Sequence, residues 1–198
     1  MNLRRFYITP EMAGLPRTEI TGSDAGHICR VLRLAAGDTV ELFDGAGSGY
    51  RARIVSATPR RVQLAVEASY LLQSESPVAI SVAQAVLKDR KMDDLVRQLT
   101  ELGIARWMPF YAARSVPVPG KKDMGPRRGR WEKIAVEAVK QCRRGRIPRI
   151  SPVGSFDDIL AASAEHDVSV LFWEGAPLGF DLSAAVPPMP RSMLLAIG

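Results

Sequence analysis

The sequence predicts two domains of different class, a small antiparallel β-barrel followed by an α/β domain with a mostly parallel sheet. Up to about residue 70, apolar and polar residues alternate in short segments separated by turns, which is typical of a small barrel. After residue 78 the apolar spacing changes to about three and a half, and strands alternate with helices. The stretch 73–77 is polar and ends in proline, so we expect domains at 1–72 and 78–198 joined by a linker at 73–77.

Three alternating segments predict strands in the first domain. Val40 and Leu42 alternate with polar residues, as do the apolar positions of 50–54 and of 62–66. One short helix is expected near 24–30. Gly45, Gly47 and Gly49 superficially suggest a phosphate-binding loop, but they lie between two alternating segments, so we expect a hairpin turn.

The second domain is predicted from alternating strand and helix signals. A helix with Met92, Leu95, Leu99 and Leu102 on its apolar face has acidic residues in its first turn and Gly103 just after its end. In chain order we expect strands at 78–87, 104–112, 168–173 and 193–197, a loop at 115–126, a helix at 127–144 and a short helix after Ser155.

Positive charge is concentrated in one segment. The formal net charge of the chain is +6, yet residues 121–149 hold eleven Lys or Arg against three Asp or Glu, a local charge of +8. Such a field favours a polyanion such as RNA, and the alternative is a solvated charged loop.

The sequence lacks the motifs of several other classes of protein. The sequence has no Walker loop, no G-x-S-x-G, no G-x-G-x-x-G opening a helix and no H-E-x-x-H. Cys29 and Cys142 lack metal-ligand spacing, so we expect no metal and a reducing cytoplasm. No apolar run approaches the roughly 20 residues that a membrane span needs, so we expect no membrane partner.

Ligands of open α/β sheets bind beyond the carboxyl ends of the strands, where Arg114 and Glu174 follow predicted strands. A charged residue there is a candidate site residue or only a solvated boundary.

Many residues across both domains resemble one family. The first domain contains the string 27–34 followed by Gly37-Asp38 and Phe43-Asp44-Gly45. The second contains, in the family's order and spacing, Lys88, Lys91-Met92-Asp93, Glu101-Leu102-Gly103, Pro109, Arg114-Ser115, Trp131, Ile134-Ala135, Glu137-Ala138, Gln141, Arg144 and Ile147-Pro148. Over nearly its whole length the chain resembles the bacterial 16S ribosomal RNA uracil-N3-methyltransferases, the RsmE family.

This resemblance implies a PUA-like barrel that binds RNA and a SPOUT-type domain whose C-terminal trefoil knot binds S-adenosylmethionine. It implies methylation of N3 of a uridine in the 16S rRNA of the small ribosomal subunit, by a homodimer. The family continues beyond Gly198 with a glycine-rich loop, so we expect the knot to be incomplete in this chain and its cofactor affinity to be weak.

The resemblance also implies residue roles. The expected RNA contacts are Arg4, Arg5, Arg30 and Arg33, and the expected substrate pocket is Arg114, Gln141 and Arg144. The expected cofactor residues are Phe172, Glu174, Ile197 and Gly198. Our hypothesis is that Arg114 is catalytic and stabilises negative charge on the uracil, while Arg144 and the basic segment hold phosphates.

Alternatives stay open at this point. Arg144 suits a solvated helix end, Gln141 suits the polar side of a helix, and Arg30 and Arg33 could flank a buried Val31-Leu32 pair. The competing functions are a non-catalytic RNA-binding protein, another SPOUT methyltransferase with a different target, and an enzyme of small acidic substrates.

Overall fold

The computed structural model describes residues 3–88, 90–113, 115, 125–175 and 186–198. Contacts divide the chain into two compact units. The first unit consists of Met1–Glu75 and Val139–Arg146, and the second of Ser76–Ala138 and Ile147–Gly198. The long helix α3 (Gly125–Cys142) therefore contributes residues to both.

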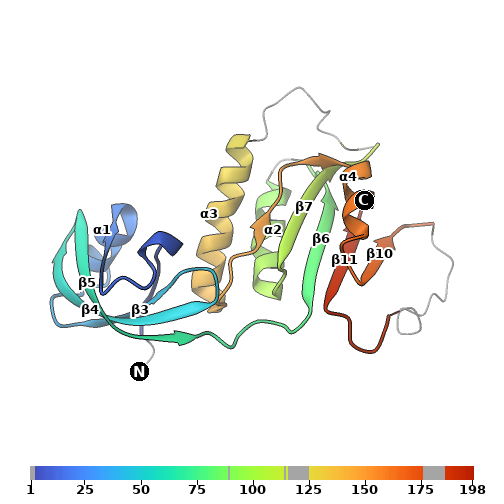
Figure 1. Cartoon of the computed structure of the whole chain (residues 1–198). Coiled ribbons are helices and arrows are strands. Elements are labelled where there is room, and N and C mark those ends of the chain that lie inside the picture. The colour runs from blue at the N-terminus through green and yellow to red at the C-terminus, as the bar shows by residue number, and fades with distance from the viewer. Residues whose placement is uncertain (1–2, 89, 114, 116–124, 176–185) are drawn as a thin grey trace. The chain divides into compact units, whose positions relative to one another are not determined.

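The first unit contains a curled five-stranded sheet in the order β1-β3-β4-β5-β2 (Figure 1). Its strands are β1 (Arg5–Tyr7), β2 (Arg17–Thr21), β3 (Thr39–Phe43), β4 (Ser48–Thr58) and β5 (Arg61–Leu71). The predicted class is confirmed, with one difference: β1 pairs with β3 in parallel, whereas the other pairs are antiparallel. Helix α1 (Gly22–Arg30) forms where a short helix was expected, and a 3-10 turn, η1, covers Pro10–Met12.

A tight turn joins β3 to β4 and confirms the predicted hairpin. The Asp44 carboxylate accepts hydrogen bonds from the backbone N–H groups of Ala46 at 2.8 Å and Ser48 at 3.1 Å, and from the Tyr50 hydroxyl at 3.2 Å. Burial alone would raise the pKa of Asp44, but these bonds outweigh it and hold the pKa below its ordinary value. Gly45 and Gly47 adopt φ values of 71° and 115°, which suit glycine.

The core of the first unit lies inside the curled sheet and against α1. Val40, Leu42, Ala52, Val62 and Leu64 are buried, and all were expected at alternating strand positions.

The second unit contains a six-stranded sheet with the path β10-β11-β6-β7-β8, and β9 pairs with β7. Its strands are β6 (Ala79–Ala85), β7 (Arg106–Tyr111), β8 (Arg149–Ile150), β9 (Gly154–Ser155), β10 (Val168–Phe172) and β11 (Ser192–Ile197). Every pairing in this sheet is parallel, which confirms the prediction.

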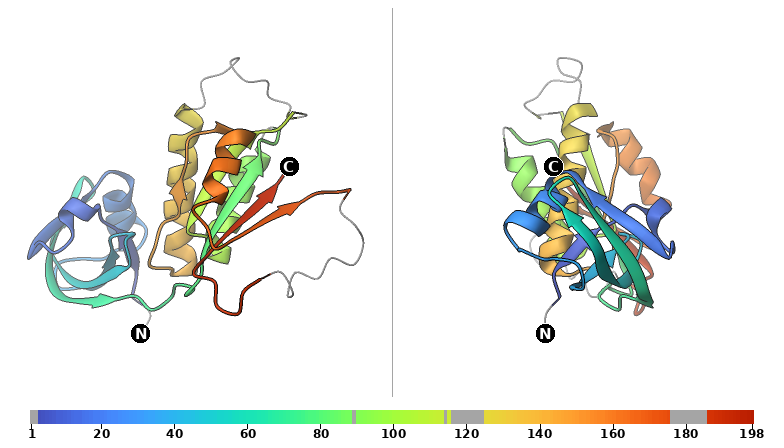
Figure 2. Two further views of the ribbon diagram at one scale, coloured as in Figure 1. Left: turned by 45° about the vertical axis from the view of Figure 1, so that its right-hand side comes forward. Right: turned by 90° about the vertical axis from the view of Figure 1, so that its left-hand side faces the viewer.

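Helices cover both faces of this parallel sheet. Helix α2 (Lys91–Leu102) and the second-unit part of α3 lie on one face, and α4 (Phe156–Ser163) lies on the other (Figures 1 and 2). Trp107 and Trp131 pack at an edge-to-face angle in the core under α2 and α3, with ring centroids 4.9 Å apart. Met108 and Phe110 point to the core under α4.

The predicted apolar face of α2 is wrong at its last position. Met92, Val96 and Thr100 are buried, whereas Leu102 is 80% exposed. Buried residues follow a spacing of four, and Leu102 falls off that line. Thr100 tolerates burial because its hydroxyl donates a hydrogen bond to the Val96 carbonyl at 2.6 Å. The helix ends as expected at Gly103, which has a φ of 101°.

Candidate active site and RNA-binding residues

The carboxyl ends of the parallel strands bring three of the expected cofactor residues together. In the strand register Phe172 of β10 lies opposite Ile197 of β11, and Ile197 lies opposite Gln84 of β6. Paired residues of parallel strands lie on the same face, so these three side chains form the last row of one face. Gly198 follows directly, and this edge is where ligands of α/β sheets bind.

This edge exposes apolar side chains. Phe172 is 49% exposed, Trp173 63% and Ile197 39%, although each is large and hydrophobic. A Cβ at Gly198 would lie 3.5 Å from Cζ of Phe110, so the sheet core begins just beneath that backbone. Glu174 is exposed one residue beyond Trp173 and takes part in an interaction of its own. Such a mixture of apolar surface and few polar groups is typical of a small-molecule site.

Arg114, the predicted catalytic residue, lies outside the described residues. The residues on either side of it, after the end of β7, are described. There the Ala112 N–H donates to the Ser115 hydroxyl at 2.9 Å, and the Ser115 N–H donates to the Ala112 carbonyl at 2.9 Å. The role of Arg114 stays a prediction.

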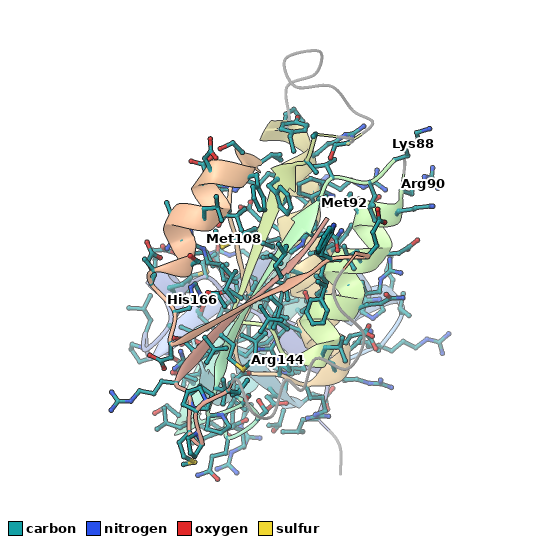
Figure 3. All side chains as sticks on the ribbon, turned by 90° about the vertical axis from the view of Figure 1, so that its right-hand side faces the viewer. Lys88, Arg90, Met92, Met108, Arg144 and His166 are labelled. Carbon is teal, nitrogen blue, oxygen red and sulfur yellow. The ribbon has the colours of Figure 1, made fainter. Side chains whose placement is uncertain are left out.

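The Lys88 to Asp93 region of the family likeness fixes α2 to its surroundings. Met92 is buried and its Sδ accepts a hydrogen bond from the Leu87 N–H at 3.4 Å. Asp93 accepts hydrogen bonds from Trp131 Nε1 at 3.2 Å and lies 2.7 Å from a guanidinium nitrogen of Arg130. Lys88 and Arg90, by contrast, extend outward from the turn before α2 (Figure 3).

The expected substrate-pocket residues Gln141 and Arg144 differ in their surroundings. Gln141 is exposed on the last turn of α3. Arg144 is only 6% exposed, and its guanidinium forms an ion pair with Glu75 (Figure 3 labels Arg144). The Glu75 carboxylate also accepts the N–H groups of Gly145 at 2.9 Å and Arg146 at 3.0 Å. A solvated helix end does not describe Arg144, because its charge is buried and paired.

The surroundings of Glu75 shift its acidity. Burial alone would raise the pKa of the Glu75 carboxyl, but the hydrogen bond and charge of Arg144 and the two backbone N–H groups outweigh burial. The pKa of Glu75 therefore lies below its ordinary value.

Arg5 lies inside the first unit rather than on its surface. Its side chain is 4% exposed, lies 3.9 Å from a carboxylate oxygen of Glu41, and stacks over the Phe43 ring at 4.2 Å from the centroid. Glu41 also accepts the Tyr70 hydroxyl at 2.8 Å. Burial lowers the pKa of Arg5, and burial with the Glu41 bond raises the pKa of Tyr70 to about 12.

The remaining expected RNA contacts are accessible. Arg30 and Arg33 are exposed at and after the end of α1, and Arg4 is exposed just before β1. Val31 is 65% exposed, so Arg30 and Arg33 do not flank a buried pair. Arg33 has a φ of 55°, which few residues other than glycine adopt.

Several cations of the basic segment, residues 121–149, are paired with acidic side chains. Nine of its Lys and Arg residues lie in the described range 125–149, and five of these have acidic partners. The pairs are Arg128–Glu132, Arg130–Asp93, Lys140–Asp24, Arg143–Glu41 and Arg144–Glu75. Sequence reasoning missed Asp24, Glu41 and Glu75, because each is far along the chain from its partner.

A serine–histidine contact is present at the opposite, amino edge of the parallel sheet. His166 Nε2 lies 2.8 Å from the Ser81 hydroxyl, and Nδ1 lies 2.8 Å from the Ala162 carbonyl. Nδ1 therefore faces a carbonyl rather than a carboxylate, and Ser81 is buried. The contact links α4 to β6 (Figure 3 labels His166) and does not form a hydrolytic triad.

Neither a metal-binding cluster nor a membrane-spanning helix is present among the residues that the structure describes. Within the described ranges, no group of three or more His, Cys, Asp or Glu side chains is arranged to hold a metal ion. No helix in the described part of the chain is both long and apolar enough to cross a bilayer.

Family models match both parts of the chain. The family described as an RNA methyltransferase domain matches residues 74–198, and the one described as an RNA methyltransferase PUA domain matches residues 20–67. Because the first match covers more than half of the chain, the chain belongs to the RNA methyltransferase family.

Curated relatives support the likeness in sequence. The chain is 29% identical over 204 residues to ribosomal RNA small subunit methyltransferase E of Bacillus subtilis (strain 168), covering 99% of this chain and 80% of that protein. It is 28% identical over 167 residues to the protein of the same name from Synechocystis sp., covering 84% of this chain and 53% of that protein. The predicted resemblance is confirmed.

Solved structures share the fold. A probable rRNA-methyltransferase from Porphyromonas gingivalis has a TM-score of 0.82 at 26% identity, covering 99% of this chain and 79% of that one. A ribosomal RNA small subunit methyltransferase E from Neisseria gonorrhoeae, bound to S-adenosyl methionine, has a TM-score of 0.84 at 20% identity, covering 99% and 80%.

Proposed function

We propose that this protein transfers a methyl group from S-adenosylmethionine to N3 of a uridine in the 16S rRNA of the small ribosomal subunit. The observation that carries the proposal is the row Phe172–Ile197 at the carboxyl edge of the parallel sheet, in a chain of the RNA methyltransferase family.

The residues at this edge fit the adenosyl group. Phe172 and Ile197 would offer apolar surface to an adenine ring, and the lack of a side chain at Gly198 would let a ligand come close to the backbone. Glu174 supplies a carboxylate that suits ribose hydroxyls. When bound, S-adenosylmethionine supplies a methyl group on a sulfonium.

The chain's own residues prepare the uridine. N3 lies on the Watson–Crick edge, so only an unpaired uridine turned out of its stack is reachable. N3 carries a proton at neutral pH, and a cation beside the ring stabilises the anion left when that proton is removed. We assign this role to Arg114, and we assign Gln141 to the substrate pocket.

The first domain, residues 1–72, is assigned to RNA binding. Arg30 and Arg33 are exposed cations that suit phosphates, and Arg4 lies before β1. Arg5 is buried beside Glu41, so its contribution is to hold β1 and β3 in place rather than to meet solvent-borne phosphates. Residues 73–77 join this domain to the methyltransferase domain, residues 78–198. The protein is proposed to act as a homodimer in the cytoplasm, where ribosomal subunits reside.

The test is methyl transfer to a defined substrate. Small ribosomal subunits that lack the modification are incubated with the purified protein and S-adenosylmethionine carrying a radioactive methyl group, and the RNA is digested to nucleosides. We expect radioactive 3-methyluridine. Radioactivity in another nucleoside would overturn the N3 assignment, and RNA binding without any transfer would support a non-catalytic RNA-binding protein instead.

A further inference from the structure

The basic residues that end α3 and follow it are not equivalent. Within 140–146, three cations form ion pairs with acids from distant parts of the first unit: Lys140 with Asp24 at 2.9 Å, Arg143 with Glu41 at 2.9 Å, and Arg144 with Glu75. The fourth, Arg146, is exposed, and its guanidinium has no acidic partner among the described residues. The first three charges are therefore engaged in holding the segment to the first unit.

The backbone of Arg146 is fixed from two sides. Its N–H donates to the Glu75 carboxylate at 3.0 Å, and it forms an isolated antiparallel bridge with Ala46 in the β3–β4 turn. The neighbouring N–H of Gly145 donates to Glu75 at 2.9 Å and lies 3.0 Å from the Ser74 hydroxyl. Three segments that are far apart in sequence thus meet at this residue.

Two glycines allow this close approach. A Cβ at Gly145 would lie 2.9 Å from Cβ of Leu72 and 3.4 Å from Cα of Gly47, so a side chain there would collide. A Cβ at Gly47 would lie 3.3 Å from Nε of Arg146, so the arginine side chain passes over the bare turn. The backbone of Arg146 is consequently held against the β3–β4 turn, and its side chain starts from that fixed point.

The charge of Glu75 is already neutralised by Arg144. Both oxygens of Glu75 are engaged, one by the Arg144 guanidinium and one by backbone N–H groups. Glu75 therefore has no oxygen left to pair with the exposed Arg146 guanidinium. Arginine offers a planar set of donors that matches a phosphate, and a solvated cation is the form that releases counterions on binding.

We propose that Arg146 is the RNA phosphate contact of this segment and that Arg144, which the resemblance suggested, is a positioning residue that holds it in place through Glu75. The proposal rests on the proposed RNA substrate. The two neighbouring arginines then have different roles. Arg144, which is 6% exposed, maintains the contacts of Glu75 with residues 144–146, which we call the Glu75 junction. The exposed Arg146 contacts the RNA.

The test is the salt dependence of RNA binding by the full chain. Dissociation constants for a transcript of 16S rRNA are measured by filter binding between 50 and 200 mM KCl for the unchanged chain and for Arg146→Ala, Arg146→Lys and Arg60→Ala. Arg60 is an exposed arginine in the β4–β5 turn of the same unit, so its variant controls for the loss of one charge.

For Arg146→Ala we expect the slope of log K against log salt to become less steep by about 0.7 to 0.9, which corresponds to roughly fivefold weaker binding near 0.1 M salt. Arg146→Lys should restore the slope, and Arg60→Ala should leave it nearly unchanged. An unaltered slope for Arg146→Ala, or an equal loss for Arg60→Ala, would overturn the proposal.

Arg144 is tested by combination. If Arg144 acts only through the junction, Arg144→Ala/Arg146→Ala should have the slope of Arg146→Ala alone, while its thermal stability falls. A further decrease in slope of the same size would make Arg144 a phosphate contact itself and overturn its positioning role. Failure of the unchanged chain to bind the transcript would instead overturn the proposed function, which distinguishes the two failures.

Discussion

Nε1 of Trp131 donates a hydrogen bond to Oδ1 of Asp93 at 3.2 Å, and this bond joins the first turn of α2 to the second turn of α3. Asp93 also pairs with Arg130 at 2.7 Å, so one carboxylate serves two successive residues of α3. The aspartate of the Lys91-Met92-Asp93 motif therefore has a structural role, which is to connect α2 to α3.

Replacing Asp93 with alanine should lower the free energy of unfolding by about 1–3 kcal/mol, because the indole N–H of the buried Trp131 loses its acceptor. Chemical denaturation followed by tryptophan fluorescence measures the change. Asp94→Ala is the matched control, since Asp94 is an exposed neighbour that pairs with the exposed Arg97 at 3.5 Å. Its effect should stay within about 0.5 kcal/mol. Equal effects of the two variants would contradict the structural role of Asp93.

The Glu75 junction should make stability depend on pH. Because the folded-state pKa of Glu75 lies below its ordinary value of 4.5, the stability from its ionised form is fully present above pH 4.5. It is lost as pH falls through the lower folded pKa. Glu75→Gln should therefore be less stable than the unchanged chain at pH 7, by about 2 kcal/mol, and the difference should narrow below pH 4.5.

Thermal melts from pH 3 to pH 7 test this prediction. Glu101→Gln provides the control, because Glu101 is exposed on α2. A difference between Glu75→Gln and the unchanged chain that stays constant across this range would show that the ionised carboxylate is not what stabilises the junction.

The fold class follows from the sequence because it depends on local periodicity. The alternation of residues 50–54 and 62–66 is set by which face of each strand meets the core, and the structure confirms it: the apolar residues of both stretches lie in the core or pack against it. The error at Leu102 has the same origin, because its apolar character was read as burial while Thr100 took the buried position. Apolarity and spacing alone do not predict that a threonine is buried in place of a leucine. Thr100 can be buried because its hydroxyl donates a hydrogen bond to a carbonyl of the same helix.

The charged contacts could not be predicted for a different reason. Glu75 and Arg144 are 69 positions apart, and Glu41 and Arg143 are 102 apart, so no local pattern connects them. The charge of residues 121–149 predicted a segment that binds a polyanion, or else a solvated loop, yet three of its cations pair with acids of the first unit. The nearness of Phe172 and Ile197 was predictable, because the carboxyl ends of parallel strands meet whatever their side chains are. Their contact with the cofactor stays a prediction.

Replacing Phe172 with alanine should weaken cofactor binding. The side chain is 49% exposed, and a bound adenine would cover the exposed half. We expect the dissociation constant for S-adenosylmethionine to rise about tenfold by calorimetry, at a temperature where thermal melts show the variant to be folded. Leu102→Ala removes another exposed apolar side chain, at the end of α2, and should leave affinity unaltered. Equal affinities for all three proteins would exclude Phe172 from the cofactor site.

Two glycine substitutions should change stability in opposite directions. Gly129 lies within α3, and a Cβ there would have no atom within 4 Å, so Gly129→Ala should stabilise the protein by about 0.5–1 kcal/mol through its helix propensity.

Gly47 has a φ of 115° and lies under Arg146, so Gly47→Ala should destabilise the protein by at least about 1 kcal/mol. Differential scanning calorimetry measures both. A stabilising Gly47→Ala would mean that the turn does not hold Arg146 closely, whereas a destabilising Gly129→Ala would mean that another part of the protein packs against α3 at this position.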